Sequence, residues 1–338
     1  MLILGPRQNL YDQKKTGGVT ILFELFLEEL RQRNISFDVI DTLADNNGGK
    51  VQALIATYVQ MLKKFRHVEH ISLQASQNVL LYVAPLAVIL GKLFGKKISV
   101  RVFAGGMNNK YEQSFLFKMV SGFVLRNVDA VFFETKYLVE YFRPYNPHTY
   151  WLPNVRKREM REKKSNNFQR RFVYIGTINE EKGIDLLCDI AKKLPEDVTL
   201  DLYGPIIEEK YSSDYFYARG VNYKGALRPD EVLDVMSTYD VLVLPSYREG
   251  YPGVIIEAFM LGLPVIATKL DGIMEMVEDG YNGLLIDIGS EVQLYEAILS
   301  IDAERYGSLH EHASASFEPY DSHARTAFFL EKIGYDVS

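Results

Sequence analysis

The chain contains a single cysteine and lacks several common catalytic and cofactor-binding patterns. Cys188 stands alone among 338 residues, which excludes an internal disulfide framework and favours a reducing compartment. No Gly-x-Gly-x-x-Gly follows a predicted strand, and no Walker A motif, Gly-x-Ser-x-Gly elbow or H-x-x-x-H pair occurs. These absences weigh against a dehydrogenase, a P-loop enzyme, a serine hydrolase and a metal site built from histidines.

Long apolar runs are also rare. The most apolar segment, VLLYVAPLAVIL at residues 79–90, is interrupted by Pro85. It is shorter than the roughly 20 residues that a membrane-spanning helix needs, so we expect a buried helix there. The first ten residues, MLILGPRQNL, lack the basic lead of a secretory signal. We therefore expect a cytoplasmic protein that is at most peripheral on the inner face of the membrane.

Acidic and basic side chains are unevenly distributed. Residues 1–152 carry 18 basic and 12 acidic side chains, whereas the remaining residues carry 20 basic and 32 acidic ones. A basic half can mark a surface for an anionic partner such as a membrane, and solvation alone explains it equally well. Nucleic acid is not an expected partner, because no basic stripe is interleaved with aromatic residues.

Short β-branched runs alternate with helical patterns through both halves. Strands are predicted at MLILGP, FDVIDT, KISVRVFAG, AVFFET and TYWLPN, and then at RFVYIG, VTLDLYG, VNYKGAL, DVLVLPS, LPVIAT and GLLIDI. Helices are predicted at residues 19–33, 50–65, 78–94, 112–126, 136–142, 183–194, 229–238, 253–261, 273–278, 291–300 and 321–333. Apolar strands that alternate with helices indicate parallel sheets covered on both faces. The predicted fold class is therefore α/β, with two doubly wound domains.

The polar, unpatterned stretch RKREMREKKSNN predicts the domain boundary. We expect a Rossmann-like lobe at residues 1–152, a charged linker at 153–170, a second Rossmann-like lobe at 171–318 and a final helix at 319–338. Ligands of open α/β sheets lie at the carboxyl ends of the strands, where helix N-termini attract anions. The glycine-bearing turns TGGVT, YREGYPGV and YGP are the candidates for such sites.

Glu257 is an acidic residue inside the apolar run VIIEAFM, where a buried carboxylate without partners would cost several kcal/mol. The predicted helix begins near Gly253, so Glu257 lies about one turn from an N-terminus suited to an anion, and Glu249 precedes it in the loop. A nucleotide sugar fits this arrangement: the diphosphate over the helix N-terminus, the ribose on Glu257 and the sugar hydroxyls on Glu249. Gly250 and Gly253 would allow close approach. The alternative is that Glu257 lies on a solvated helix face.

The segment SYREGYPGVIIEAFMLGLPVIATKLDGIMEMVEDGYNGLLI resembles the signature segment of the retaining glycosyltransferases of family 4. The similarity extends through VYIGTINEEKGIDLL, LDLYGP, VNYKGALRPDEV and DVLVLPS, and more loosely through TGGVT, RVFAGG and WLPN. That family has the GT-B fold, with two facing Rossmann-like lobes, and a Glu-x7-Glu pair, here Glu249 and Glu257. The resemblance implies a retaining glycosyltransferase with a nucleotide-diphosphate sugar, UDP- or GDP-linked, as donor. It also implies that the C-terminal helix returns to the first lobe and that no metal or other cofactor is required.

The resemblance assigns roles to individual residues. Glu249 and Lys182, the lysine of EKG, are the implied catalytic residues: Glu249 faces the donor sugar, and Lys182 steadies the diphosphate leaving group, on which negative charge develops. Glu257 is implied to bind the ribose. The other implied donor-binding residues are Gly17, Gly18, Gly204, Ala226, Leu227, Gly250, Tyr251, Pro252, Gly253 and Val254.

The chain departs from the family pattern at two places. Thr177 stands where family members commonly have an arginine for the diphosphate, and Arg248, Arg7 and Lys15 are equal candidates to replace it. The familiar histidine of the first lobe has no match in VRVFAGG. These departures leave two alternatives: a sugar-nucleotide-binding or scaffold partner of another transferase that has lost turnover, or a GT-B epimerase or phosphorylase.

The acceptor is expected on the first lobe, which is the basic one. We interpret it as a saccharide or lipid-linked saccharide of cell-surface polysaccharide synthesis. Basic residues near anionic headgroups contribute about 1 kcal/mol each. The candidates are Lys63, Lys64, Arg66, Lys92, Lys96 and Lys97.

Overall fold

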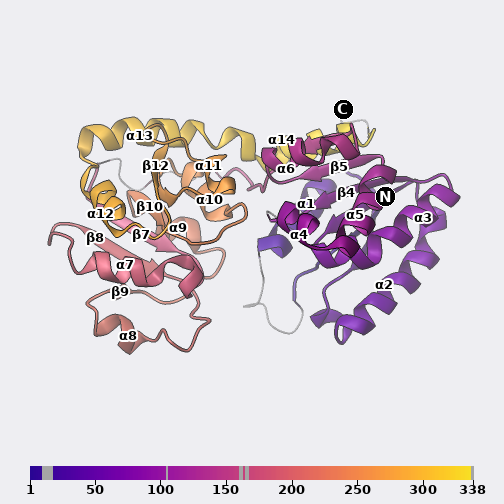
Figure 1. Cartoon of the computed structure of the whole chain (residues 1–338). Coiled ribbons are helices and arrows are strands. Elements are labelled where there is room, and N and C mark those ends of the chain that lie inside the picture. Colours follow the sequence, from indigo (N-terminus) through magenta and orange to yellow (C-terminus); the bar gives the residue numbers. More distant parts are fainter. Residues whose placement is uncertain (10–17, 104–105, 160–162, 164–166, 336–338) are drawn as a thin grey trace. The chain divides into compact units, whose positions relative to one another are not determined.

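The computed structural model describes residues 1–9, 18–103, 106–159, 163 and 167–335 (Figure 1). The described residues form two compact units: an N-terminal unit, which comprises Met1–Lys157 and Asp321–Ser338, and a C-terminal unit, Arg158–Tyr320. Each unit contains one six-stranded sheet. The predicted α/β class with two separate sheets is therefore confirmed.

The sheet of the N-terminal unit has the strand order β2-β1-β3-β4-β5-β6, and all its pairings are parallel. Its strands are β1 (Leu2–Gly5), β2 (Asp38–Asp41), β3 (His70–Ala75), β4 (Lys97–Val102), β5 (Ala130–Phe133) and β6 (Thr149–Trp151). Chain direction across the sheet reverses between β1 and β3, because β1 leads outward to β2 while β3 leads to β4. The loop that follows β1 therefore emerges at a switch point of the topology.

Helices cover both faces of this sheet. They are α1 (Gly18–Gln32), α2 (Lys50–Lys64), the π-helical turn η4 (Val79–Val83), α3 (Ala84–Leu93), α4 (Met107–Gln113), α5 (Phe115–Asn127), α6 (Lys136–Phe142) and α14 (Ser322–Lys332), with short 3₁₀ turns at Asp45–Asn47, Phe65–His67 and Arg143–Tyr145. One apolar cluster joins the sheet to α2, η4, α3, α4, α5 and α6. A second cluster, on the other face, joins it to α1 and α14.

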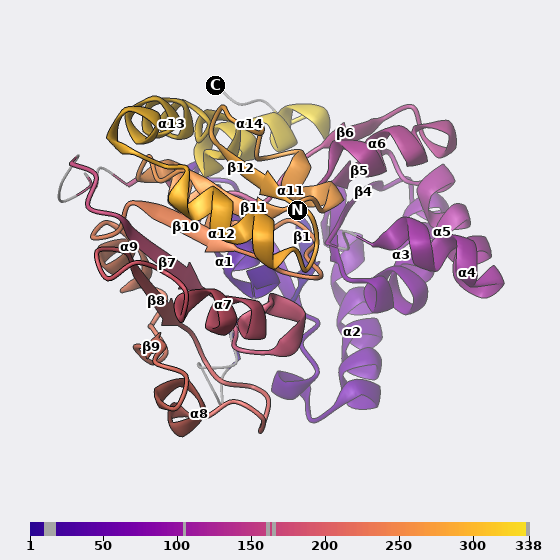
Figure 2. The ribbon, with the colours of Figure 1, turned by 60° about the vertical axis from the view of Figure 1, so that its left-hand side comes forward.

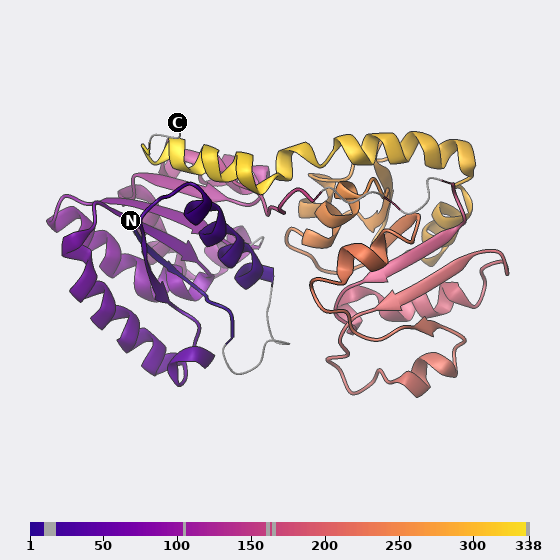
Figure 3. The same cartoon turned by 180° about the vertical axis from the view of Figure 1, so that it is seen from behind.

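The C-terminal helix packs on the N-terminal unit, as the resemblance implied (Figure 3). The rings of Phe26 on α1 and Phe329 on α14 meet edge to face, with 5.0 Å between their centroids. The Ser322 hydroxyl donates to a carboxylate oxygen of Glu29 at 2.5 Å, and both side chains are buried. A polar anchor inside an apolar contact fixes the register of the two helices, since a shift would leave the Glu29 carboxylate buried without a donor.

Strand β3 and the break between α4 and α5 were not predicted. Polar residues occupy alternate positions of β3, His70, Ser72 and Gln74, and all are buried. Neighbouring polar groups satisfy them in part: His70 Nε2 lies 2.8 Å from Ser99 Oγ on β4. The search for continuous apolar runs therefore missed this central strand. Ser114 separates α4 from α5 by capping the second helix, accepting from the Phe117 amide.

The sheet of the C-terminal unit has the strand order β12-β11-β10-β7-β8-β9, and all its pairings are parallel. Its strands are β7 (Arg171–Ile175), β8 (Thr199–Tyr203), β9 (Asn222–Tyr223), β10 (Val241–Leu244), β11 (Val265–Thr268) and β12 (Gly283–Ile286). Its helices are α7 (Ile184–Ala191), α8 (Ser213–Tyr217), α9 (Val232–Met236), α10 (Gly253–Met260), α11 (Asp271–Met274), α12 (Glu291–Leu299) and α13 (Ala303–Ala315), with 3₁₀ turns η6 (Glu180–Lys182) and η7 (Glu318–Tyr320).

The two crossovers at the centre of this sheet run in opposite directions (Figure 2). The chain passes from β7 through α7 to β8 on one side, and from β10 through α10 to β11 on the other. Right-handed crossovers that diverge in this way place their helices on opposite faces. Accordingly, α7 packs with α12, and α10 packs with α13. The carboxyl ends of β7 and β10 thus flank the switch point, where a ligand is expected.

Helices α8 and α13 were not predicted. Helix α13 buries only Tyr306, Leu309 and Ala313, and its sequence AERYGSLHEHASA carries polar residues at most other positions, so the apolar period was too sparse to detect. In the described parts of both units, no helix is long and apolar enough to cross a membrane.

Candidate active site

Lys182 and Glu249 meet beside the switch point of the C-terminal sheet. Lys182 ends η6, after β7, and Glu249 lies in the loop after β10. The Lys182 ammonium donates to a carboxylate oxygen of Glu249 at 2.6 Å, and the two side chains are 22% and 11% exposed. The two residues that the resemblance marked as catalytic therefore form an ion pair that is largely sheltered from water but open to a ligand on one side.

Two hydroxyl groups that the sequence analysis missed hold the carboxylate. The Ser246 hydroxyl donates to the same Glu249 oxygen at 2.9 Å. Behind it, the Thr268 hydroxyl donates to the Ser246 carbonyl oxygen at 2.6 Å. Both residues are fully buried at the ends of β10 and β11. The only sequence signal was a serine and a threonine as the last residues of the predicted strands DVLVLPS and LPVIAT, which is too common to single them out.

The loop that carries Lys182 is fixed at both ends. The Asn179 side chain accepts from the Lys182 amide at 3.1 Å and caps η6. Gly183 follows with φ of +72°, and a Cβ atom there would lie 2.2 Å from the Pro245 carbonyl oxygen. Only glycine tolerates both the left-handed backbone and this contact. The backbone of the β10 loop therefore positions the lysine against Glu249.

Helix α10 begins at Gly253 with Pro252 as N-cap, and no side chain caps it. Its first amide groups are consequently open to an external acceptor, as at other helix N-termini. Gly253, Val254, Glu257 and Met260 are partly exposed, while the intervening residues of the helix are buried. Glu257 thus lies on the same partly exposed stripe as the helix N-terminus, one turn along. This placement answers how an acid is tolerated in VIIEAFM, and it agrees with a solvated face as well as with a ligand contact.

The loop before α10 is held tightly. A Cβ atom on Gly272 would lie 1.7 Å from the Gly250 carbonyl oxygen. Tyr251 is buried, and its hydroxyl lies 3.2 Å from that of Tyr320. Anchored in this way, the backbone from Gly250 to Gly253 presents its groups in a fixed direction.

Gly204, after β8, lies at a second close approach of the backbone. With φ of +148°, it contacts the Gly176 carbonyl oxygen so closely that a Cβ atom would sit 1.6 Å away. Its amide donates to the Gly225 carbonyl oxygen at 2.9 Å. Ala226 and Leu227 follow directly and are exposed and half-buried, respectively. The ends of β7, β8 and β9 are thus brought to one edge, next to the Lys182 loop.

The first-lobe glycines belong to the N-terminal unit. Gly18 begins α1 and is exposed. Gly17 lies outside the described residues, and so does Lys15.

The candidates for a second cation differ in their surroundings. The Arg7 guanidinium is engaged with Glu24 in the N-terminal unit, at 2.6 Å. Arg248, next to Glu249, is 80% exposed and lies 3.6 Å from a carboxylate oxygen of Glu181. Of these two, Arg248 shares a unit with the Lys182–Glu249 pair and has the freer side chain.

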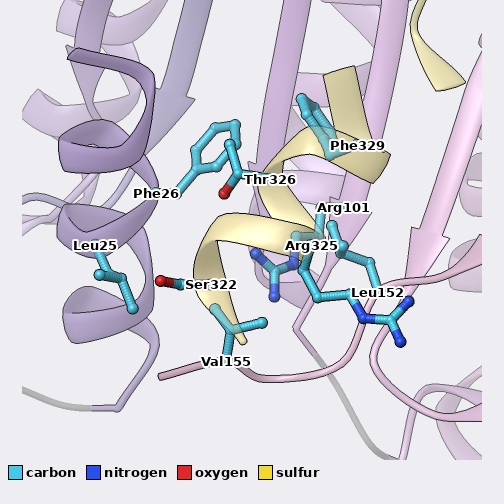
Figure 4. A pocket seen from close by; sticks show the side chains of 9 residues that line it. All are labelled: Leu25, Phe26, Arg101, Leu152, Val155, Ser322, Arg325, Thr326 and Phe329. Atoms are coloured by element: carbon cyan, nitrogen blue, oxygen red, sulfur yellow. The ribbon is translucent and has the colours of Figure 1, made fainter. Parts of the chain in front are cut away.

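Arg101 lies in VRVFAGG, the segment in which the family's first-lobe histidine has no match, and it is a structural residue. It is buried, it donates to the Pro153 carbonyl oxygen at 2.8 Å, and burial lowers its pKa to about 10. Side chains of α1 and α14 enclose a small cavity of about 10 Å³ beside it (Figure 4). That volume holds about one water molecule, so this cavity cannot receive a nucleotide.

Other chemistry finds little support in the described part of the chain. Cys188 is buried on α7, and burial raises the pKa of its thiol to about 12, which suits a structural residue rather than a nucleophile. Among the described residues, no group of three or more His, Cys, Asp or Glu side chains is arranged to hold a metal ion.

Comparisons with known proteins bear on the family and the fold of the chain. Residues 169–303 match the family described as "Glycosyl transferases group 1". An uncharacterized glycosyltransferase of Methanocaldococcus jannaschii is 25% identical over an alignment of 309 residues, and 84% of each chain is covered. A lipopolysaccharide core biosynthesis glycosyltransferase of Rhizobium meliloti is 31% identical over 134 residues, 38% of each chain. Among solved structures, Anabaena HepE in complex with UDP has a TM-score of 0.76 at 18% identity, with 98% of each chain covered. The last similarity confirms the GT-B fold.

Proposed function

The chain is a nucleotide-sugar glycosyltransferase of group 1 with the GT-B fold, and from that premise we propose that it is a retaining enzyme with a saccharide or lipid-linked saccharide acceptor in cell-surface polysaccharide synthesis. The acceptor class is supported by the relative from Rhizobium meliloti, which is named as a glycosyltransferase of lipopolysaccharide core biosynthesis. The Lys182–Glu249 pair beside the open N-terminus of α10 is the observation that carries the donor side of the proposal.

In the proposed complex the donor lies along the carboxyl edge of the C-terminal sheet. The diphosphate accepts from the amides of Tyr251, Gly253 and Val254 at the start of α10, where Pro252 has no N–H to donate. The ribose hydroxyls donate to Glu257, and the sugar hydroxyls donate to Glu249. Gly204, Ala226 and Leu227 form the side on which the base lies.

Donor binding would exchange one ion pair for another. Lys182 is held by Glu249 in the free protein at 2.6 Å, and the diphosphate offers a stronger, doubly charged partner to the same ammonium. Lys182 would then neutralise the charge that develops on the leaving oxygen as the sugar–phosphate bond breaks. Glu249 would keep its hydrogen bond from Ser246 but lose the one from Lys182, and could then accept from the sugar hydroxyls. We name no protein nucleophile, and we propose that the amides and lysine suffice for the diphosphate without a metal ion.

Arg248 is the proposed replacement for the arginine that Thr177 displaces. It is 80% exposed and only loosely placed near Glu181, at 3.6 Å, so its side chain can turn toward a phosphate at little cost. An Arg248→Ala variant that binds the donor as tightly as the wild type would contradict this assignment.

The donor is proposed to carry UDP or GDP. The test is thermal unfolding of the full chain with UDP, GDP, ADP and TDP and with their sugars, repeated on Glu257→Ala and on Glu296→Ala. Glu296 is an exposed acid on α12 and serves as the matched control. A ligand at 100 times its dissociation constant adds about 2.7 kcal/mol, which raises the melting temperature of a unit of this size by several degrees.

We expect one base to raise the melting temperature of the wild type and of the control, but not of Glu257→Ala. Stabilisation that persists in Glu257→Ala would show that this carboxylate does not bind the ribose. Release of the matching nucleotide diphosphate from its sugar, followed with an added acceptor mixture, then separates a transferase from a binding protein that has lost turnover.

The acceptor is proposed to meet the protein at the inner face of the membrane. Of the basic residues expected near headgroups, Lys63, Arg66, Lys92 and Lys97 are exposed. Lys64 forms an ion pair with Asp38, with 3.3 Å between its Nζ and the Oδ1 of the carboxylate. The exposed residues lie at the C-terminal ends of α2 and α3 and at the start of β4, at one edge of the N-terminal unit.

A further inference from the structure

Helix α2 is apolar on the side that faces away from the protein. Ala53, Thr57 and Met61 are buried toward the sheet, as expected for a covering helix. On the opposite side, Val51, Ile55, Val59 and Leu62 are 66%, 57%, 44% and 49% exposed. Their spacing of four, four and three residues places them in one stripe along the helix. A helix with apolar residues on both sides is normally buried on both sides, and nothing within the described N-terminal unit covers this stripe.

Two neighbouring elements repeat the pattern. Helix α5 exposes large apolar side chains from its first turn onward, with Phe115 exposed by 78%. The segment of η4 and α3 exposes four more, although its other face is deeply buried. The exposed apolar residues of these elements are Phe115, Leu116, Met119 and Phe123 on α5, and Tyr82, Ile89, Leu93 and Phe94 on and after η4 and α3.

These residues form one surface, because their helices form one layer. Helices α2, η4, α3 and α5 share one apolar cluster over the same face of the N-terminal sheet. Within the layer, η4 packs against both α2 and α5. Helix α3 packs against α5 (Figure 1). Side chains opposite the cluster therefore point away from the sheet in a common direction. We call the twelve exposed apolar residues of this layer the outer apolar face.

Basic residues outnumber acidic ones around the outer apolar face. Between residues 46 and 111 the only acidic residue is Glu69. The exposed or half-buried basic residues of the same stretch lie near the helix ends: Lys50, Lys63, Lys64, Arg66, Lys92, Lys96, Lys97 and Lys110. Helix α5 contains no acid and adds Arg126 and Lys118. Lys118 pairs with Glu112 on α4 at 3.0 Å, and Lys64 pairs with Asp38 at 3.3 Å, so the other basic residues carry the excess of positive charge.

Apolar side chains inside a basic rim match the interface of an anionic bilayer, where apolar residues enter the acyl boundary and basic residues meet the headgroups. A large exposed apolar patch also marks some protein interfaces. A second copy of this chain fits poorly, because a two-fold contact would set the patch against itself and bring two basic rims together. The rim thus selects a negatively charged lipid surface.

We propose that the outer apolar face inserts into the surface of an anionic membrane and docks the N-terminal unit there. This inference deepens the proposed function, since it supplies the surface that presents a lipid-linked acceptor, but docking itself requires neither the donor nor turnover. It goes beyond attraction of basic residues to headgroups, because insertion of apolar side chains persists when salt screens the charges.

The test is co-sedimentation of the full chain with vesicles of phosphatidylcholine alone and of phosphatidylcholine with a third phosphatidylglycerol. It is run at about 0.1 M and about 1 M salt, at which the Debye length falls from about 10 Å to about 3 Å. The variant Ile55→Ser with Phe115→Ser removes two large side chains of the outer apolar face, 57% and 78% exposed. The control, Ile207→Ser with Tyr217→Ser, removes two side chains of the C-terminal unit that are 60% and 88% exposed.

We expect the wild type and the control to bind the anionic vesicles, with a part of the binding retained at high salt. The Ile55/Phe115 variant is expected to bind at least tenfold more weakly at both salt concentrations. Equal binding by all three proteins, binding that vanishes entirely at high salt, or no binding by the wild type would overturn the proposal. So would a wild-type dimer in sedimentation that the Ile55/Phe115 variant converts to a monomer, because the face would then join two copies.

Failure of the docking proposal and failure of the proposed function are distinguishable. The Ile55/Phe115 variant should keep the nucleotide-dependent rise in melting temperature, because Lys182, Glu249 and helix α10, which carry the proposed donor site, lie in the other unit. Conversely, Glu257→Ala should lose that rise and still bind anionic vesicles.

Discussion

Replacement of Lys182 by methionine tests the central ion pair through both stability and rate. Methionine keeps most of the apolar stem but removes the ammonium that donates to Glu249 at 2.6 Å. The Glu249 carboxylate is then left 11% exposed, with the Ser246 hydroxyl as a remaining donor. Breaking an exposed pair costs at most about 1 kcal/mol, and breaking a buried one costs about 3–5 kcal/mol. For this partly exposed pair we expect a loss of about 1–3 kcal/mol in the free energy of unfolding.

The same variant should slow the reaction far more than it destabilises the protein. Removal of one group that stabilises developing negative charge lowers kcat by about 10²–10³. We therefore expect release of the nucleotide diphosphate to slow by that factor under conditions in which the variant is fully folded. Lys182→Arg keeps the charge but not the shape, so its rate should lie between those of the wild type and Lys182→Met.

A double-mutant cycle separates the two roles. If Glu249 is the partner of Lys182 in the free protein, the stability losses of Lys182→Met and Glu249→Gln will not add, with a coupling of about 1 kcal/mol or more. Thermal scans of the C-terminal unit report this coupling, at about 2–4 °C for each kcal/mol. Lys193→Met is the matched control: it lies at the other end of α7, where it pairs with Glu291 on the surface.

The reasoning would be refuted by a Lys182→Met enzyme that retains its rate within about threefold, since the loss expected from an essential cation is far larger. It would also be refuted by strictly additive stability losses, or by a fall in rate of the same size in Lys193→Met. The first result would remove the leaving-group role, and the second would remove the ion pair of the free protein.

Three further changes have defined outcomes. Burial lowers the pKa of His70 from its usual 6.5 to about 4. The free energy of unfolding is therefore highest above pH 6.5 and falls as the pH drops toward 4, by about 2 kcal/mol between pH 7 and pH 5. The His70→Gln variant should lack this pH dependence in urea unfolding, followed by the fluorescence of Trp151, the single tryptophan, which lies in the same unit. Thr268→Val leaves the buried Ser246 carbonyl oxygen without its hydroxyl donor and should cost about 1–3 kcal/mol while lowering kcat more than it changes the KM for the donor. Gly183→Ala adds a Cβ atom 2.2 Å from the Pro245 carbonyl oxygen at a φ of +72°. Calorimetry should therefore show that the free energy of unfolding falls by more than the roughly 1–2 kcal/mol of left-handed strain alone. An unchanged melting temperature would mean that the loop relaxes freely.

The strong elements of the fold were predictable because their sequences repeat the expected periods. Apolar strands such as VLVL at residues 241–244 and amphipathic helices such as α1 were located to within a few residues. Strand β3 was not, because His70, Ser72 and Gln74 resemble the polar face of an exposed strand, and only the neighbouring strand β4 supplies partners such as Ser99 that allow their burial. The outer face of α2 was not identified either, because a helix prediction at residues 50–65 does not show which of its apolar side chains are exposed; only the structure shows that Val51 and Ile55 are.

By itself, the sequence determined the α/β class and most strands of both lobes, because these depend on the local period of apolar residues. It also contained the segment at residues 246–286 that carries the family resemblance, because a motif is read from adjacent residues. It could not determine that Lys182 and Glu249, 67 positions apart, are an ion pair, that Ser246 and Thr268 stand behind the carboxylate, or that Gly183 must yield space to the β10 loop. Those facts depend on which strands are neighbours. Only the order β10-β7, with its diverging crossovers, brings the two loops to one edge of the sheet and makes a site from them.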